Sequence, residues 1–599
     1  MTKRPDIQIA RTVAVLAVVG FHLGAPGFTN GFLGVDAFFV ISGFLMGLLY
    51  TRIGTLDFYN RRLTRLLPSL LMVSILFLFL GLVFLQPFEI DELTTQIITG
   101  ILGISNIAYW SQDSYFQPNR FRPLLNLWSL GVEIQFYLLF PFLLFLKRKS
   151  KFILPALALL SFGLNILVLQ ISPKTSFFLL PTRLWEFLVG VLMACTALPE
   201  LKKKVKRASL LLAGLIFIVA FLIPIDSNST SWIYGHPGLN SILIVVATAT
   251  ILKLKVDTPQ LQSFVGKIAV KIGDFSYEIY LVHFPILVFV NYVAFSGTIT
   301  EVENVTEAII ALLITFALSF FIYKLSRLRA MRKPLVLSSS VVVLSLILFV
   351  APFSKVALTG NSEISEVTSF ALADRSPYRC GKIFRITQPK SELCLISGEV
   401  DNSRPNLLLF GNSHADMIKS EVVEVSDGRA NVYFWVQNSP FQLEVEQIKD
   451  SMIKYGISKV LIHSSTFNPD LEILKKLLAE TKDVEYVMLG SVPTYSSNLP
   501  KIIYKANPTK NADISTIDLR PYVVPDSLLG DDFYKDVESP NFKYISTLTT
   551  MCSGSKCAWH DDKNRLYYFD TDHLTLTGAH ALKEPISRSL DSLLGNLGS

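Results

Sequence analysis

The sequence predicts a polytopic α-helical membrane domain followed by a C-terminal α/β domain, and two observations lead to this prediction. The first is composition, because 51% of the 599 residues are hydrophobic and only 17% are charged. The second is order: long apolar segments fill the first ~350 residues, whereas short β-rich runs alternate with helical patterns in the last ~190. A chain this long and this apolar is too large for one soluble domain.

Apolar segments long enough to cross a membrane occur about eleven times, since a transmembrane helix needs roughly 20 apolar residues. They lie near 12–29, 31–50, 68–87, 128–146, 152–171, 178–198, 208–225, 238–254, 273–295, 305–325 and 335–353. A further segment, 95–112, is only moderately apolar, and a full crossing there would break the charge pattern of the loops that follow. We therefore expect this segment to be interfacial or re-entrant.

The basic residues occur in short clusters at every second connection between these segments. The clusters read KRPDIQIAR, YNRRLTRLL, KRKSK, LKKKVKR, KLK and YKLSRLRAMRK. Loops rich in Lys and Arg stay in the cytoplasm, so the pattern predicts a cytoplasmic N-terminus and places residues beyond about 354 outside the cytoplasm. Membrane topology thus accounts for the formal charge of +7, and we expect no nucleic acid partner.

The five cysteines are unevenly distributed. Cys195 lies in an apolar segment, while Cys380 and Cys394, and Cys552 and Cys557, form two close pairs in the polar last third. Such pairs suit disulfides in an oxidising compartment, and the alternative is four unrelated free thiols. Because no His or Cys residues stand at ligand spacing, we expect no metal site.

We expect four parts along the chain: a membrane domain over 1–330, an additional transmembrane helix over 331–354, a linker or extension over 355–404, and an α/β domain over 405–599. In the last part the β-rich runs are NLLLF, ANVYFWV, SKVLIH and VEYVMLG, and helical patterns lie near 415–425, 443–455 and 469–481. Strands that alternate with helices indicate a parallel sheet.

A candidate catalytic serine follows the first of these strands. NLLLF leads into Gly411, Asn412 and Ser413 and then into a helical run, so Ser413 lies at a strand-to-helix turn where free N–H groups can stabilise an oxyanion. A serine needs a base to become a nucleophile. Near the C-terminus, Asp570 and His573 are three residues apart, which lets the carboxylate orient the imidazole. The sequence therefore predicts a Ser413–His573–Asp570 triad.

The alternative roles are structural, with Ser413 as a helix N-cap and Asp570 as a cap of the last helix. Gly-Asn-Ser-His-Ala and Asp-x-x-His resemble the first and last blocks of the SGNH hydrolase and acyltransferase family, which implies a flavodoxin-like fold. The family usually has Asp at the position of Asn412. Its middle blocks supply oxyanion donors, for which Asn438 and Asn468 are the candidates. Three nearby ionisable residues are expected to be structural: His414, Asp572 and His580.

Ionisable residues also occur inside the apolar segments, where they are costly and usually functional. Arg11 and His22 are eleven residues apart, which brings them to the same helix face about 16 Å apart, so we expect both to face one groove. For the remaining ionisable residues of these segments, the alternative to a catalytic role is a buried structural pair. Arg183 and Glu186, for instance, have the spacing to neutralise each other. The other candidates are Asp36, Glu133 and His283.

Residues 1 to about 330 resemble the membrane-bound acyltransferase type-three family. The Arg-x10-His spacing of Arg11 and His22 matches it, and so, in order, do GVDAFFVISGFL, NRRLTRLLP, LWSLGVEIQFYLLFP, PTRLWEFLVG and FSYEIYLVHFPI. The chain departs from the family at Asn126, where His is frequent, and at Ser326, where Glu is frequent. The fused arrangement resembles bacterial enzymes that O-acetylate surface polysaccharides.

The resemblance implies an acyltransferase of the bacterial inner (plasma) membrane, with multiple transmembrane helices and with its SGNH domain in the periplasm. Acetyl-CoA would be the acyl donor, and a surface polysaccharide such as lipopolysaccharide O-antigen would be the acceptor. We expect no permanently bound cofactor, and membrane lipid is the remaining expected partner. Alternatives are a peptidoglycan O-acetyltransferase, or a glycan exporter with a fused SGNH esterase.

Each predicted site residue has a role in this scheme. His22 would carry or assist the acetyl group inside the membrane domain, and Ser413 would receive it as an ester outside, with His573 as base and Asp570 orienting it. Cations at the cytoplasmic mouth would hold the phosphates of CoA, and the alternative for each of them is a role in anchoring the topology. The expected donor- or substrate-binding residues are Arg11, Arg61, Arg62, Arg65, Glu133 and Arg183.

Overall fold

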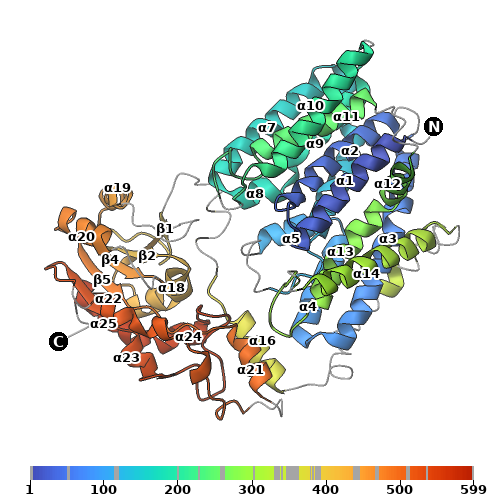
Figure 1. The fold of residues 1–599 in the computed structure, drawn as a ribbon. Coiled ribbons are helices and arrows are strands. Elements are labelled where there is room, and N and C mark those ends of the chain that lie inside the picture. The colour runs from blue at the N-terminus through green and yellow to red at the C-terminus, as the bar shows by residue number, and fades with distance from the viewer. Residues whose placement is uncertain are drawn as a thin grey trace. The chain divides into compact units, whose positions relative to one another are not determined.

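The computed structural model describes residues 4–49, 54–112, 120–197, 201–226, 229–255, 263–300, 302, 304–328, 338, 341–345, 363–377, 380, 384, 393–435, 445–465, 471–507, 513–534 and 537–595. The chain divides into two compact units, Met1–Gly360 and Asn361–Ser599 (Figure 1). Each unit has its own hydrophobic core, so the two are described separately.

The helical elements of the first unit are α1 (Pro5–His22), η1 (Gly31–Leu33), α2 (Gly34–Leu49), α3 (Thr55–Phe84), α4 (Pro87–Ile101), α5 (Ser105–Ser111), α6 (Leu127–Lys149), α7 (Ile153–Ile171), α8 (Pro173–Phe178), α9 (Leu180–Cys195), α10 (Lys203–Leu222), α11 (Leu239–Leu254), α12 (Phe264–Asp274), α13 (Ser276–Val290) and α14 (Val305–Ser326). Many of their outward-facing side chains are large and apolar, as expected where lipid replaces water.

Six helices among the described residues are long and apolar enough to cross a membrane: Gly31–Leu49, Thr55–Phe84, Leu127–Lys149, Ile153–Ile171, Lys203–Leu222 and Val305–Ser326. The bent pair α12 and α13 makes a seventh if it counts as one span. Three other predicted spans correspond to α1, α9 and α11. The span predicted over 335–353 lies largely outside the described residues. A multi-helical membrane domain is therefore confirmed, whereas the number of eleven crossings stays a prediction.

The limits of several predicted spans differ from the observed helices; the span expected over 68–87, for example, is α3, which already starts at Thr55. The span expected over 12–29 is α1, which starts earlier and ends at His22, because the next residues turn at Gly24 and Gly27, both with positive φ. The span expected over 273–295 is not straight, since α12 and α13 meet at Phe275 with a bend of 72°. The segment 95–112 contains the end of α4 and all of α5.

Two glycines allow α2 and α9 to pack at backbone contact. A Cβ on Gly43 would lie 2.0 Å from a backbone carbonyl oxygen of α9, and one on Gly190 would lie 2.2 Å from a backbone carbonyl oxygen of α2. Any larger side chain would push the helices apart. This packing holds the first turns of both helices together, and those turns carry Asp36 and Arg183.

The second unit contains a six-stranded sheet of order β1-β3-β2-β4-β5-β6. β2 (Asn406–Gly411), β3 (Asn431–Trp435), β4 (Ile457–His463), β5 (Glu485–Leu489) and β6 (Phe542–Ile545) are parallel, whereas β1 (Leu393–Leu395) is antiparallel to β3. Both faces of the sheet are buried, since Leu407 and Leu409 belong to one core cluster and Leu408 and Phe410 to another. This explains why NLLLF is uniformly apolar rather than alternating.

Helices cover both faces of this sheet. Residues of α18 (Ser413–Ser426) and α25 (Lys583–Leu594) pack in the cluster of Leu407, and residues of α19 (Val445–Tyr455) and α20 (Leu471–Glu480) pack in the cluster of Leu408. The remaining elements are α16 (Glu363–Ala373), α21 (Leu499–Ala506), η5 (Arg520–Tyr522), η6 (Pro525–Leu529), α22 (Gly530–Tyr534), α23 (Leu548–Met551), β7 (Cys552–Ser553), β8 (Lys556–Cys557) and α24 (Leu576–Ala581).

The predicted α/β domain is confirmed, with the four expected strands as β2 to β5 and the three expected helices as α18 to α20. The structure adds β6, β1 and α16, of which the last two lie in the segment 355–404 expected to be a linker or extension. Because β1 pairs with β3 in the sheet, part of that segment is built into the second unit.

The cysteine pairs form disulfides, Cys380–Cys394 and Cys552–Cys557, as the spacing predicts. The first ties the residues before β1 to the sheet, and the second closes the short β7–β8 hairpin. Cys195 is a free thiol.

Candidate active site

Ser413 lies at the carboxyl edge of the sheet. It follows the central strand β2 and is the first residue of α18, and its side chain is exposed. Gly411 is required at the end of β2, because a Cβ there would lie 1.8 Å from the carbonyl oxygen of His463 at the end of β4. In the sheet, β3 lies on one side of β2 and β4 lies on the other, so the strand order reverses at β2. Ligands of open α/β sheets bind at the carboxyl ends of the strands at such a point.

His573 and Asp570 belong to a tight loop that precedes α24. The Asp570 carboxylate accepts hydrogen bonds from the backbone N–H groups of Asp572 (3.1 Å) and His573 (2.8 Å), which folds the loop around it. The backbone N–H of Leu499 donates to the Asp570 carbonyl (3.1 Å), which ties the loop to α21. Asp570 itself is buried.

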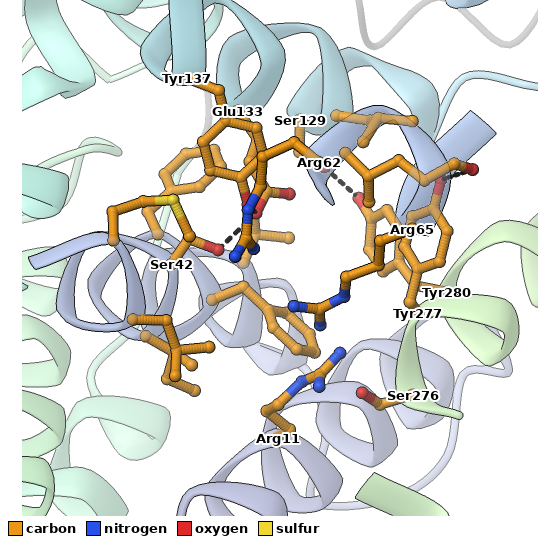
Figure 2. A pocket seen from close by; sticks show the side chains of 18 residues that line it. Arg11, Ser42, Arg62, Arg65, Ser129, Glu133, Tyr137, Ser276, Tyr277 and Tyr280 are labelled. Atoms are coloured by element: carbon orange, nitrogen blue, oxygen red, sulfur yellow. Dashed lines mark hydrogen bonds between the residues drawn. The ribbon is translucent and has the colours of Figure 1, made fainter. Parts of the chain in front are cut away.

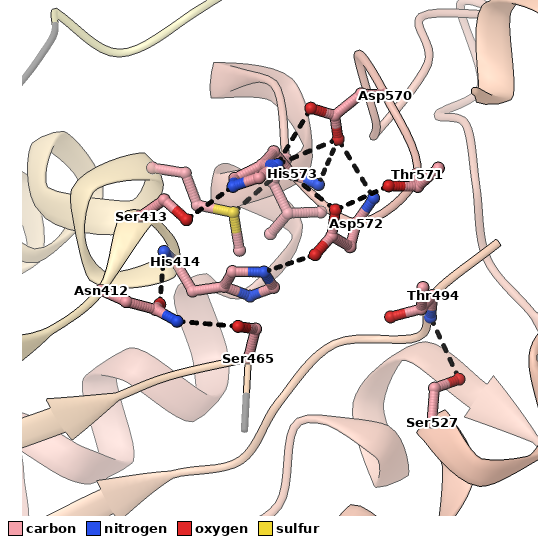
Figure 3. A network of polar contacts seen from close by, with 12 residues as sticks. Asn412, Ser413, His414, Ser465, Thr494, Ser527, Asp570, Thr571, Asp572 and His573 are labelled. Atoms are coloured by element: carbon pink, nitrogen blue, oxygen red, sulfur yellow. Dashed lines mark hydrogen bonds and ion pairs between the residues drawn. The ribbon is translucent and has the colours of Figure 1, made fainter. Parts of the chain in front are cut away.

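The structure brings the three predicted triad residues together (Figure 3). Nε2 of His573 lies 2.7 Å from Oγ of Ser413, and Nδ1 lies 2.9 Å from Oδ2 of Asp570. One imidazole nitrogen therefore faces the hydroxyl and the other a carboxylate, which is the geometry of a hydroxyl activated by an oriented base.

Other residues occupy the structural roles considered as alternatives for this triad. Asn412 is the N-cap of α18, because its side chain accepts from the N–H of His414 (2.9 Å), and Ser413 is the next residue. The last helices are preceded by Thr575, whose side chain caps α24 by accepting from the N–H of Gly578. Neither Ser413 nor Asp570 is thus a cap of these helices.

A second carboxylate adjoins the base. Oδ1 of Asp572 lies 3.3 Å from Nδ1 of His573, and Oδ2 lies 3.1 Å from Nε2 of the buried His414. Burial alone would lower the pKa of His573, but Asp570 and Asp572 raise it to about 10. The two imidazoles hold the pKa of Asp572 below its usual range despite burial, and burial lowers the pKa of His414. Asp572 and His414, expected only as structural neighbours, therefore set the charge around the base.

Replacing Asp572 by Asn should move the pH profile of ester cleavage to lower pH. His573 accepts the Ser413 proton only when it is neutral, and two carboxylates hold its pKa above the ordinary value of about 6.5. The rate should therefore rise through the alkaline range in the parent protein and level off earlier in the variant. The measurement is cleavage of p-nitrophenyl acetate by the purified full chain from about pH 6 to about pH 10, corrected for spontaneous hydrolysis.

The matched control for this experiment is Asp562→Asn, which removes an exposed carboxylate from the same C-terminal region. It should leave the profile of the parent unchanged. An Asp572→Asn profile that coincides with the parent would show that Asp572 does not influence the base.

The oxyanion donors expected from the middle of the domain, Asn438 and Asn468, lie outside the described residues. At the described edge of the sheet, the amide of Asn412 donates to Oγ of Ser465 (2.7 Å), which links the residues that follow β2 and β4. The N-terminus of α18 itself is an electropositive site at Ser413.

Two groups of described residues have ligand atoms within 4.8 Å of one another, close enough to share a cation. In the group of His414, Asp572 and His573, these atoms already pair with each other. The second group is Glu421, Glu424 and His580, where His580 is exposed, as expected, and pairs with Glu421 (3.2 Å). The expectation of no metal stays a prediction.

Three arginines line a cavity of about 60 Å³ in the helical unit. Figure 2 shows the guanidinium groups of Arg11, Arg62 and Arg65 gathered around one space. Arg62 packs its guanidinium on the rings of Phe58 (5.8 Å) and Tyr137 (5.9 Å). Such a set of cations suits an anionic ligand.

Glu133 lines the same cavity, but its carboxylate is already engaged, because the hydroxyls of Ser42 and Tyr137 both donate to Oε1. Arg61 is exposed and does not line the cavity, and its donor-binding role stays a prediction. The face of α3 that borders the cavity carries Arg62 and Arg65, and Arg61 lies to the side of that face.

His22 lines a second and larger cavity of about 340 Å³, whose walls are mainly apolar and include several aromatic rings. Arg183 also lines it, fully buried, 3.5 Å from Asp36 and 3.1 Å from Glu186. The pairing expected for Arg183 and Glu186 is therefore present. His236 completes this cluster, with Nε2 3.7 Å from Asp36.

Their shared helix face led us to expect that Arg11 and His22 face one groove, but the structure does not place them in one. They line separate cavities, whose walls share Val35 and Tyr280. The rise of α1 between them is about 16 Å.

Fold and site together define a helical membrane domain fused to an α/β domain that carries a Ser–His–Asp arrangement, and the comparisons assign its family. Residues 4–324 match the family described as "Acyltransferase domain", and residues 379–588 match the "SGNH domain (fused to AT3 domains)". The chain belongs to this acyltransferase family.

Several relatives of the chain are named O-acetyltransferases. O-acetyltransferase OatA of Staphylococcus aureus (strain NCTC 8325 / PS 47) is 33% identical over 335 residues, covering 52% of this chain and 55% of that protein. The putative O-acetyltransferase SAS0844 of Staphylococcus aureus (strain MSSA476) is 35% identical over 315 residues, covering 49% and 52%. The chain thus spans about half the length of the curated relatives it matches.

Among solved structures, the periplasmic domain of the Salmonella ser. Paratyphi A lipopolysaccharide acetyltransferase aligns with a TM-score of 0.30 and 15% identity. The alignment covers 39% of this chain and 98% of that one.

Proposed function

We propose that this protein is an O-acetyltransferase that moves an acetyl group from cytoplasmic acetyl-CoA across the membrane to hydroxyls of an exported polysaccharide such as lipopolysaccharide O-antigen. One observation carries the proposal: an oriented Ser413–His573–Asp570 arrangement is joined in one chain to a membrane acyltransferase domain. The preference for O-antigen over peptidoglycan rests on the resemblance seen in the sequence.

The donor binds where the arginines converge. Arg11, Arg62 and Arg65 would pair with the phosphates of CoA, because guanidinium groups bind phosphate oxygens in a bidentate manner. The cavity of about 60 Å³ is too small for CoA itself, so the nucleotide would lie at its mouth. The acyl end would have to reach His22 past Val35 and Tyr280, which belong to the walls of both cavities.

In the first transfer, the Nε2 lone pair of His22 attacks the thioester carbonyl. A C–N bond forms, the C–S bond breaks, and the thiolate of CoA takes a proton from the cytoplasm. The acetyl group is then held as an acylimidazolium in the larger cavity, which His22 lines.

In the second transfer, Oγ of Ser413 attacks the acetyl carbon while His573 takes its proton, which restores the imidazole of His22 and yields an acetyl ester on Ser413. His573 then gives this proton to the surrounding water and becomes neutral again. A sugar hydroxyl attacks the ester, His573 accepts the proton of that hydroxyl and returns it to Ser413, and the acetylated sugar leaves. Asp570 holds His573 in the required tautomer throughout.

The sidedness of this scheme follows from the basic loops and from the cysteines. The positive-inside pattern favours a cytoplasmic N-terminus, and the two disulfides suit an oxidising compartment such as the bacterial periplasm. We further propose that α1, α9 and α11, the bent pair α12–α13 and the segment 335–353 cross the inner membrane together with the six longer helices, which makes eleven crossings. The parallel strand order supports a flavodoxin-like assignment of the SGNH domain.

The proposal predicts that alkali-labile acetyl groups on surface polysaccharide depend on this protein. O-acetyl esters are released by mild alkali and N-acetyl groups are not, so acetate released from extracted polysaccharide can be compared between cells with and without the gene. Feeding isotopically labelled acetate traces the acetyl group to the acetyl-CoA pool.

The cell fraction that contains the labelled acetyl group distinguishes the proposed acceptor from the alternatives. Label in the lipopolysaccharide fraction supports the proposal, and label in peptidoglycan alone contradicts the proposed acceptor. A rise in acetyl content when the gene is removed would instead identify an esterase that trims an exported glycan.

A further inference from the structure

The imidazole of His22 is in contact with the buried imidazole of His283. Nδ1 of His22 on α1 lies 3.2 Å from Nε2 of His283 on α13, and the ring of Phe284 packs edge-on against His22 with centroids 4.9 Å apart. His283 is 1% exposed. These residues are 261 positions apart in the sequence, so only the fold reveals the pair.

The backbone determines which nitrogen of His283 carries a proton. Its Nδ1 lies 2.8 Å from the carbonyl oxygen of Tyr280 and 3.1 Å from that of Ile279. A carbonyl oxygen can only accept, so Nδ1 must be the donor. In the described part of the chain no carboxylate forms an ion pair with either imidazole, and a buried imidazolium without a counter-ion is costly. His283 is therefore neutral, and its Nε2 has a free lone pair.

This assignment determines the tautomer of His22 in turn. Since Nε2 of His283 can only accept, Nδ1 of His22 must donate to it, which leaves the lone pair of His22 on Nε2. His22 lines the cavity of about 340 Å³, whereas His283 does not. The edge of the His22 ring opposite His283 thus carries the nucleophilic nitrogen.

The carbonyl that orients His283 is itself held in place. The amide of Asn126 donates to the same Tyr280 oxygen (2.6 Å), and the hydroxyl of Tyr280 bonds to Oγ of Ser129 (2.7 Å). Both Asn126 and Ser129 lie at the start of α6, so three helices position the imidazole pair.

We propose that His283 is a positioning residue that holds His22 in the tautomer whose Nε2 lone pair attacks the acetyl thioester. The inference rests on the proposed function. When the C–N bond forms and the C–S bond breaks, the ring of His22 becomes a cation, and its Nδ1 proton is shared with Nε2 of His283, which disperses the charge. The proton returns fully to Nδ1 when the acetyl group leaves for Ser413, so His283 ends each cycle unchanged.

Two amide variants of His283 separate this role from simple packing. In His283→Gln the side-chain oxygen can reach the position of Nε2 and accept from His22, whereas in His283→Asn the shorter amide can reach only the position of Nδ1. With the purified full chain and acetyl-CoA, we expect kcat for CoA release to fall about 100-fold in His283→Asn and to stay within about fivefold of the parent in His283→Gln. The KM for acetyl-CoA should not change in either, because the donor binds at the arginines.

Equal losses in the two variants, or full activity in His283→Asn, overturn the inference. They leave the proposed function intact as long as His22→Gln is inactive, whereas an active His22→Gln overturns the proposed function itself. Solid-state NMR of the full chain with 15N-labelled histidine tests the tautomer without relying on a variant of His283, the His22 signals being those lost in His22→Gln. A proton on Nδ1 of His22 is expected, and a neutral ring with its proton on Nε2 overturns the inference.

Discussion

Ser413→Ala is expected to abolish acetylation of the glycan while leaving the protein inserted and folded. The side chain is exposed and does not cap α18, so its removal costs little stability, but it removes the atom that receives the acetyl group. Loss of a serine nucleophile lowers kcat by on the order of 10⁶ in serine hydrolases. The assays are alkali-labile acetyl on surface polysaccharide and cleavage of p-nitrophenyl acetate, both of which should fall to background.

Ser420→Ala is the matched control, because Ser420 lies on the same helix and its hydroxyl contacts that of Ser376 (3.2 Å) instead of the triad. It should retain both activities. Glycan acetylation that persists in a normally expressed Ser413→Ala protein would falsify the covalent role of Ser413 and leave its hydroxyl without a function in transfer.

His22→Gln should also abolish acetylation of the glycan, but it should not change the cleavage of an activated ester. The glutamine amide can still donate to His283, so the bundle keeps this contact, yet it has no basic nitrogen to take the acetyl group. Loss of a positioned histidine typically costs about 10² to 10⁴ in rate, and more when it is the nucleophile. Glycan acetylation should therefore disappear, whereas p-nitrophenyl acetate, which delivers its acetyl group directly to Ser413, should be cleaved at the rate of the parent.

The contrast between the two substrates is the internal control of this experiment. Loss of both activities in His22→Gln would indicate general misfolding, which a lowered melting temperature would confirm. Survival of glycan acetylation in a stably inserted His22→Gln protein would mean that the acetyl group does not pass through His22, and the exporter with a fused esterase would become the better hypothesis.

The triad was predictable from sequence because its determinants are local. Asp570 and His573 are three residues apart in one loop, and Ser413 directly follows a uniformly apolar strand at a Gly-Asn turn. The four strands found by pattern are buried on both faces, so each is a clear apolar run. β1 escaped detection because it has three residues and pairs at the edge of the sheet, where no periodic pattern can develop.

The arrangement in the helical unit could not be derived in the same way. Helical periodicity puts Arg11 and His22 on one face, but it cannot show that Tyr280 from a distant helix contributes to the walls of both of their cavities. The choice of Arg62 over Arg61 likewise depends on how α3 is rotated against its neighbours. The pairing of His22 with His283 depends on α1 meeting α13, a tertiary contact that no local pattern encodes.

The division of the bundle interior into two cavities has an electrical consequence. A continuous water-filled passage through an energised membrane would let ions and protons flow down their gradients, and every such leak dissipates the membrane potential. Between the arginine side and the His22 side, Val35 and the hydrogen-bonded Tyr280 belong to both walls. A two-carbon fragment can be handed past such a barrier on a side chain, whereas a hydrated ion would need an open pore. The transfer proposed above would therefore export a chemical group while the membrane around the helical unit stays sealed.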